Sequence, residues 1–132
     1  QRARAVPDLE QYHKTHTFLS DALTLEAGKE IEKAVAEKKP FYLNMAHYAV
    51  HSPFETDERF ISHYTDPNKS QQARAFATLI EGMDKSLGDI LDKLEDMGIA
   101  ENIRIIFLGC TTRGCCRLWF IRPIQGKKRI GI

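Results

Sequence analysis

The 132-residue chain has no apolar run near the roughly 20 residues that a membrane-spanning helix needs. Residues 1–9 also lack the apolar core of a signal peptide, so no export leader is expected in this stretch, although a longer precursor could carry one. A content of 42% hydrophobic and 28% charged residues is typical of a soluble globular domain and excludes a disordered chain. We therefore expect neither a membrane nor a lipid surface as a partner.

Acidic residues are absent from residues 110–132, which hold six Lys and Arg and a charge balance of +6. Residues 1–109 hold 13 Lys and Arg against 18 Asp and Glu, a balance of −5, and contain no cysteine or tryptophan. The three cysteines of the tail have no Cys-x-x-Cys spacing and are odd in number, which disfavours a zinc site and a disulfide framework. The character of the sequence changes at Gly109.

Regular structure is expected in four segments. The predicted elements are helices near 21–38 and 70–97 and strands near 41–45 and 103–108. The order helix, strand, loop, helix, strand is typical of an α/β crossover on a parallel sheet. Two strands with two helices cannot cover both faces of such a sheet, so the sequence indicates a slice of something larger.

The second helix has the clearest periodicity. Ser70 is a plausible N-cap, and Gly98 a plausible terminator. The expected buried stripe consists of Ala73, Phe76, Ala77, Ile80, Leu87, Ile90, Leu91 and Leu94. Asp84, at the edge of this stripe, is expected to be a buried hydrogen-bonding residue, and Gly88 to permit close helix packing.

The most informative segment is PFYLNMAHYAVHSPF at 40–54, in which an apolar run leads to two histidines just before Pro53. Strand ends of α/β sheets deliver side chains to loops where ligands bind. By itself, a histidine in such a loop is more often structural than catalytic. No nucleophile and no metal cluster accompanies the histidines in this sequence.

The combination of stretches resembles the sulfatases of the alkaline-phosphatase superfamily. The resemblance rests on KPFYLNMAHYAVHSPF at 39–54, the helix before it, FATLIEGMDKSLGDILDKLEDMGIAENIRIIFLG at 76–109 and, less closely, GKK at 126–128. It implies an alkaline-phosphatase-like three-layer fold, of which residues 1–109 would be a partial catalytic domain. It also implies hydrolysis of sulfate esters, sulfated carbohydrates or aryl sulfates, through a formylglycine nucleophile and a divalent cation, usually Ca²⁺.

Carried over by position, His51 corresponds to the family histidine that contacts a sulfate oxygen or protonates the leaving group. Lys128 corresponds to the family lysine near the sulfate, although Gln125 replaces the arginine of that pattern. His47 is expected to be structural. Family members are commonly exported, to the periplasm, the lysosome or the exterior.

Three family features are missing from the sequence. It has no Cys-x-Pro-x-Arg or Ser-x-Pro-x-Arg motif, no N-terminal aspartate pair, and no Asp-Asn-Gly after the last strand, where Gly109 is followed by Cys110. We therefore expect no nucleophile, no bound cation and no activity from this chain alone. A reading-frame disruption near codon 110 would explain both the lost motif and the change of charge.

Two alternatives stay open. The first is a phosphatase or phosphodiesterase of the same superfamily, because phosphate and sulfate esters pose similar charge problems. The second is a non-enzymatic α/β module whose basic tail binds an acidic partner, which predicts salt-sensitive binding that is lost on deletion of 110–132. Nucleic acid is not the expected partner.

Overall fold

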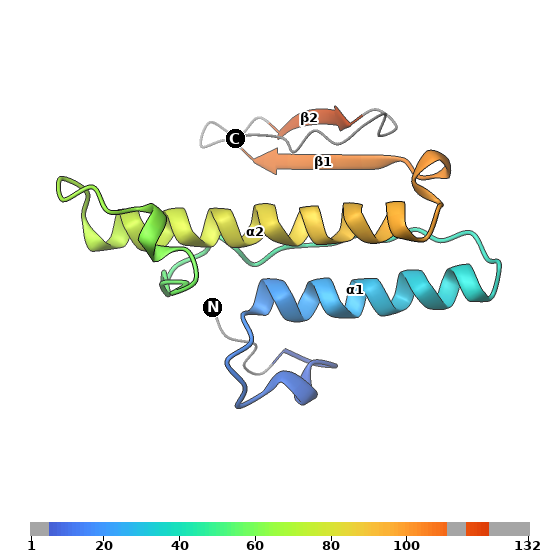
Figure 1. The fold of residues 1–132 in the computed structure, drawn as a ribbon, viewed down its shortest axis with the longest axis horizontal. Helices are drawn as coiled ribbons and strands as arrows, with labels where there is room; N and C mark the ends of the chain where they lie inside the picture. The colour runs from blue at the N-terminus through green and yellow to red at the C-terminus, as the bar shows by residue number, and fades with distance from the viewer. Residues whose placement is uncertain (1–5, 111–115, 122–132) are drawn as a thin grey trace. The chain divides into compact units, whose positions relative to one another are not determined.

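A computed structural model of the chain describes residues 6–110 and 116–121. The helices are α1 (Leu19–Ala36) and α2 (Gln71–Asp96), and the strands are β1 (Ile105–Cys110) and β2 (Cys116–Ile121) (Figure 1). Short 3-10 helices cover Glu10–Tyr12, Ile61–His63 and Ala100–Asn102. The contacts divide the chain into Gln1–Ile90 and Leu91–Ile132. None of the helices among the described residues has the length and hydrophobicity of a membrane span.

The first helix forms close to its predicted position. It begins at Leu19, preceded by the extended residue Phe18, two residues before the predicted start. At its end, the backbone N–H of Lys39 donates to the carbonyl of Ala34 (3.0 Å), and Lys38 adopts a left-handed conformation with φ 54°. This reversal and the following proline end the helix at Ala36, two residues before the predicted boundary.

The second helix is bounded by the predicted signals. The Ser70 hydroxyl accepts a hydrogen bond from the backbone N–H of Ala73 at 3.1 Å, which is N-cap geometry. At the other end, Ile99 N–H donates to the carbonyl of Leu94 (3.1 Å) and Gly98 N–H to that of Glu95 (2.9 Å), with Gly98 at φ 68°. This pair of bonds is a Schellman motif, whose left-handed position glycine adopts without strain.

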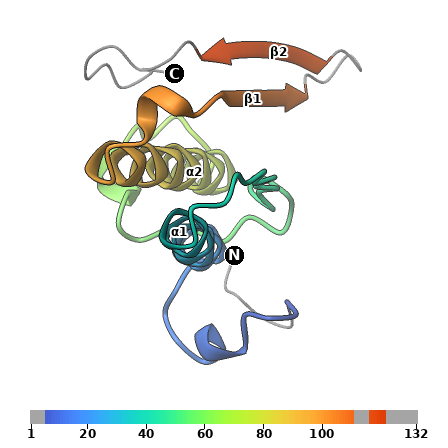
Figure 2. The same cartoon turned by 90° about the vertical axis from the view of Figure 1, so that its right-hand side faces the viewer.

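The two helices run side by side in the same direction up to Ile90 (Figures 1 and 2). Three small residues of α2, Thr78, Gly82 and Ser86, are buried at intervals of four. Ser86 hydrogen-bonds the hydroxyl of Thr24 on α1. Of this row, only Ser86 is seen to reach α1, because Thr78 bonds the backbone of Asp57 and Gly82 lies beside Asp57 and Phe60 in the loop before α2.

The predicted apolar stripe of α2 is only partly buried. Of the predicted positions, only Leu94 is buried, Ala73 and Phe76 are exposed, and the others are intermediate, whereas the unpredicted Ala75 and Leu79 are buried. Asp84 is exposed, so its predicted burial is wrong. Gly88 is not at a close packing contact, because a Cβ built there would meet no atom within 4 Å. The apolar pattern marked large residues, whereas the buried positions of α2 include small and polar ones.

Gly88 and Gly98 of α2 and its C-terminal turn give opposite expectations for stability. Gly88→Ala should raise the free energy of unfolding by about 0.5–1 kcal/mol, because alanine is the better helix former and open space surrounds the site. Gly98→Ala should lower it by about 1 kcal/mol, because of the positive φ. Urea unfolding of both variants checks the pair. A loss of stability in Gly88→Ala would contradict the open environment of that site.

The predicted strand at 41–45 is absent from the described structure, since residues 39–48 have no regular secondary structure. The segment runs from the end of α1 back toward the start of α2 (Figure 1), and Tyr42 is 92% exposed. Residues 41–47 make no backbone hydrogen bond to any other described residue. A strand requires a neighbouring strand to pair its backbone groups, and the described residues offer none at this position.

The second predicted strand forms, but not as part of a parallel sheet. β1 pairs with β2 in an antiparallel ladder, with Ile105 opposite Ile121 and Cys110 opposite Cys116. A parallel connection needs a crossover of a dozen or more residues, whereas only the five residues 111–115 join these strands. The predicted three-layer α/β arrangement with parallel strands is therefore not seen among the described residues.

Candidate active site

His51 lies in the loop between residues 39–48, which have no regular secondary structure, and α2, and its side chain is exposed to solvent. Its backbone N–H donates to the carbonyl of Tyr48 at 3.1 Å, and its Nδ1 is 2.6 Å from the carbonyl oxygen of Ser52. Because a carbonyl oxygen only accepts, Nδ1 must carry a proton in this contact. In the neutral ring Nε2 is then the basic nitrogen, and in the protonated ring Nε2–H is the second donor.

His47 occupies a different environment four residues earlier. Its side chain is half-buried, and its Nδ1 is shielded from solvent without a hydrogen-bond partner in the described structure. Burial lowers the pKa of His47 below its usual 6.5, because desolvation disfavours the charged ring. This environment agrees with a structural role for His47.

The lowered pKa of His47 predicts a pH-dependent stability. The unfolded chain binds the His47 proton more readily than the folded chain, so the free energy of unfolding should fall as pH drops below about 6.5 and level off below the folded-state pKa. His47→Gln should remove this contribution. Urea unfolding of both proteins at pH 7.5 and 5.5 measures it. An equal pH dependence in the two proteins would contradict the assignment.

The loop after His51 ends in a charged network that the sequence reading missed. Asp57 is 1% exposed, and its carboxylate accepts hydrogen bonds from Nε and Nη2 of Arg59, at 2.9 and 2.6 Å. Nη2 also lies 2.9 Å from Oδ2 of Asp21 at the start of α1. The hydrogen bond with Asp57 raises the pKa of Arg59, which stays charged. Asp-x-Arg is too common a pattern to mark such a site, and Asp21 is distant in sequence.

The described residues do not fit the calcium ion that the resemblance implies. No group of three or more His, Cys, Asp or Glu side chains there could hold a metal ion. The most buried carboxylate, Asp57, already faces a guanidinium. Carboxylate and amide oxygens would be the required ligands, and Cys110 stands where the resemblance places an aspartate. Lys128, the second predicted site residue, lies outside the described residues.

Two solved structures share the fold. The chain superposes on a crystal structure of Ps i-CgsB in complex with k-i-k-neocarrahexaose with a TM-score of 0.66 and 26% identity, covering 70% of this chain and 20% of the other. A second structure of Ps i-CgsB gives a TM-score of 0.65 and 22% identity, covering 80% of this chain and 26% of the other. The second likeness concerns the fold alone.

Sequence comparison adds a curated relative and a family. The lipoteichoic acid synthase-like protein YvgJ of Bacillus subtilis (strain 168) is 28% identical over an alignment of 107 residues that covers 77% of this chain. The chain spans only 17% of that relative's length. The family model described as Sulfatase matches residues 3–109. With that match extending over most of its length, the chain belongs to the sulfatase family.

Proposed function

We propose that the chain is the histidine-bearing part of a catalytic domain that hydrolyses sulfate esters, with His51 as its contact to the substrate. The observation that carries the proposal is the exposed imidazole of His51, on a loop inside the family match. His47, by contrast, is half-buried. The proposal rests on His51 alone among the predicted site residues, since the structure does not describe Lys128.

In this proposal the ring of His51 acts through Nε2. The contact of Nδ1 with the Ser52 carbonyl orients the imidazole. A protonated ring then presents Nε2–H to a sulfuryl oxygen or gives that proton to the departing alkoxide, which is general acid catalysis. A formylglycine and a cation, supplied from outside the described residues, would provide the nucleophile and the charge that hold the ester.

A sulfated carbohydrate is the substrate class that we favour. The solved structure of Ps i-CgsB holds k-i-k-neocarrahexaose, an oligosaccharide by its name. Carbohydrate sulfates lie at the cell exterior, and their hydrolysis there would require export of the intact protein. We therefore propose that the intact protein is exported. Aryl sulfates share the reacting group and serve as assay substrates.

Phosphate-ester chemistry is the second candidate, and one observation favours it. YvgJ is named for lipoteichoic acid synthesis and not for a sulfatase activity, so the family match alone does not specify sulfur chemistry. An assay of the intact protein with 4-nitrophenyl phosphate beside 4-nitrophenyl sulfate separates the two. Faster turnover of the phosphate would replace the first proposal by the second.

We further propose that residues 110–132 are foreign to the catalytic domain. In support, the family match ends at Gly109, where the charge balance changes from −5 to +6. A frame disruption near codon 110 predicts that an alternative reading frame encodes Asp-Asn-Gly. Sequencing of the encoding DNA tests this, and the absence of that motif from both other frames would refute it.

The 132-residue chain by itself is expected to leave 4-nitrophenyl sulfate unhydrolysed, because it lacks a Cys/Ser-x-Pro-x-Arg motif to supply the nucleophile. A spectrophotometric assay with added Ca²⁺ checks this expectation. Turnover above the background would show that the nucleophile lies in this chain. Upstream coding sequence gives the independent test: such a motif supports the sulfatase proposal, and its absence favours the non-enzymatic module.

A further inference from the structure

The loop that carries His51 is attached much more firmly at one end than at the other. On its N-terminal side, residues 41–47 make no backbone hydrogen bond to another described residue, and Tyr42 is almost fully exposed. On its C-terminal side, six residues after the histidine, Asp57 is almost completely buried. The course of the loop is therefore determined mainly from the side of Asp57.

Asp57 is held to α2 through its backbone. Its N–H donates to Oγ1 of Thr78 at 3.0 Å, and that hydroxyl donates to the carbonyl of Ala75 at 2.7 Å. Closer to the histidine, Phe54 packs edge-on against Phe76, with ring centroids 5.3 Å apart. The loop thus follows α2 at two points before it reaches the Ile61–His63 turn.

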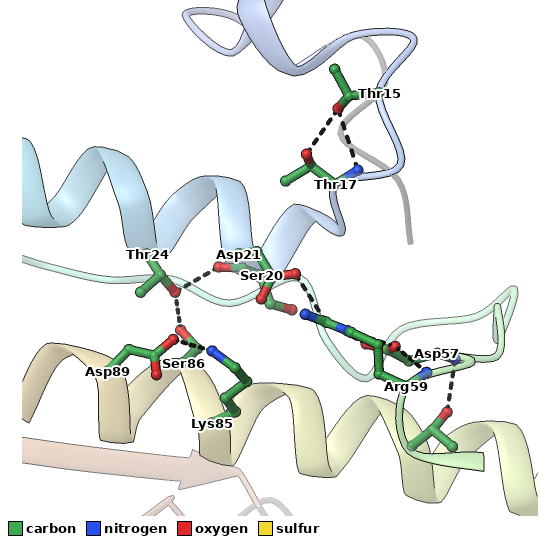
Figure 3. Close-up of polar contacts among 11 residues, drawn as sticks. Thr15, Thr17, Ser20, Asp21, Thr24, Asp57, Arg59, Lys85, Ser86 and Asp89 are labelled. Atoms are coloured by element: carbon green, nitrogen blue, oxygen red, sulfur yellow. Dashed lines mark hydrogen bonds and ion pairs between the residues drawn. The ribbon is translucent and has the colours of Figure 1, made fainter. Parts of the chain in front are cut away.

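Arg59 connects the same point to α1. Its guanidinium binds the Asp57 carboxylate through two nitrogens, reaches Asp21 at 2.9 Å, and lies 5.3 and 5.2 Å from the ring centroids of Phe18 and Phe60. Figure 3 shows Arg59 extended between Asp57 and the first turn of α1. The backbone N–H of Arg59 also donates to Asp57 Oδ1 at 3.1 Å, which closes a turn at this point.

We propose that Arg59 is a positioning residue for His51: through Asp57 and Asp21 it fixes the loop that presents the imidazole. This inference rests on the proposed function for its catalytic meaning, but the geometry does not depend on it. The guanidinium has the planar fork that binds one carboxylate with two nitrogens while a third contact reaches another, which the point charge of lysine lacks. The arginine side chain is 43% exposed, so it contributes little buried apolar surface, and its effect on the loop comes from its directed contacts with the two carboxylates.

The test compares Arg59→Met with Lys29→Met in the 132-residue chain, because Lys29 forms an ion pair with Glu26 (2.7 Å) away from the loop. Amide hydrogen exchange is followed at Asp57 and Phe60, whose N–H groups are hydrogen-bonded, and the His51 ring carbon shift is recorded by NMR. Arg59→Met should raise exchange at both amides about 10-fold or more beyond any change at the core residue Ile31, and should shift the His51 signal. Lys29→Met should leave all of them within about 2-fold of the original.

Two further variants keep the proposal falsifiable. Asp57→Asn removes the charge without leaving an unpaired buried carboxylate, so it decides the question if Arg59→Met does not fold. Arg59→Lys should restore exchange only in part. Unchanged His51 signals and loop exchange in the folded variants would show that Arg59 serves stability alone and would overturn the inference. None of these measurements uses a sulfate ester, so a failed sulfatase assay leaves their outcome intact.

Discussion

An arylsulfatase that carries residues 39–54 of this chain in place of its own histidine segment is expected to hydrolyse 4-nitrophenyl sulfate. In that chimaera, His51→Ala should lower kcat by about 100- to 1,000-fold, the usual effect of removing a general acid or a charged donor from the transition state. Hydrolysis is followed at about 405 nm, where 4-nitrophenolate absorbs, and at saturating substrate, so that the measured change is in kcat.

His47→Gln in the same chimaera is the matched control. His47 differs from His51 in its half-buried ring and unpartnered Nδ1 in the described structure, so its replacement should change kcat by less than about 3-fold. Equal losses in the two variants would show that both act through folding of the segment. An active chimaera that tolerates His51→Ala would remove His51 from the catalytic step.

The second large effect concerns the buried face of α2. Leu79→Ala in α2 is expected to lower the free energy of unfolding by about 3 kcal/mol, because Leu79 is 4% exposed and its truncation leaves a cavity. Urea denaturation followed by circular dichroism measures the change, provided that the slope with urea is the same in both proteins.

Leu25→Ala on α1 is the control for this experiment, since Leu25 is 52% exposed. The same atoms are removed, but little buried surface is lost, so the free energy of unfolding should change by less than about 1 kcal/mol. If Leu25→Ala is as costly as Leu79→Ala, then the exposed face of α1 is covered in solution and the core described here is incomplete.

The helices could be predicted from the sequence because their signals are local. Ser70 bonds a backbone group three residues away, and Gly98 supplies the left-handed residue of a motif completed within six residues. The strand at 41–45 could not be predicted reliably, because its formation depends on a neighbouring strand and not on its own residues. β1 formed with the opposite pairing because the partner that it found follows immediately in the chain.

The candidate site divides in the same way. The resemblance singles out His51 as a candidate because a short motif carries it. No comparable sequence signal marks Arg59, whose partners Asp57 and Asp21 come together only in the folded chain. The small buried residues of α2 were also not predicted, because a search for large apolar residues passes over Thr78, Gly82 and Ser86.

The segment after α1 without regular secondary structure is expected to promote aggregation of the isolated chain. Residues 41–45 join aromatic and aliphatic side chains with no charge and no glycine, and their amides are unpaired in the described structure. Such a stretch is a template for strand addition between molecules, the first step of fibrous aggregation. Concentrated solutions of the chain are therefore expected to aggregate through residues 41–45, and the charge introduced by Tyr42→Lys should reduce this aggregation.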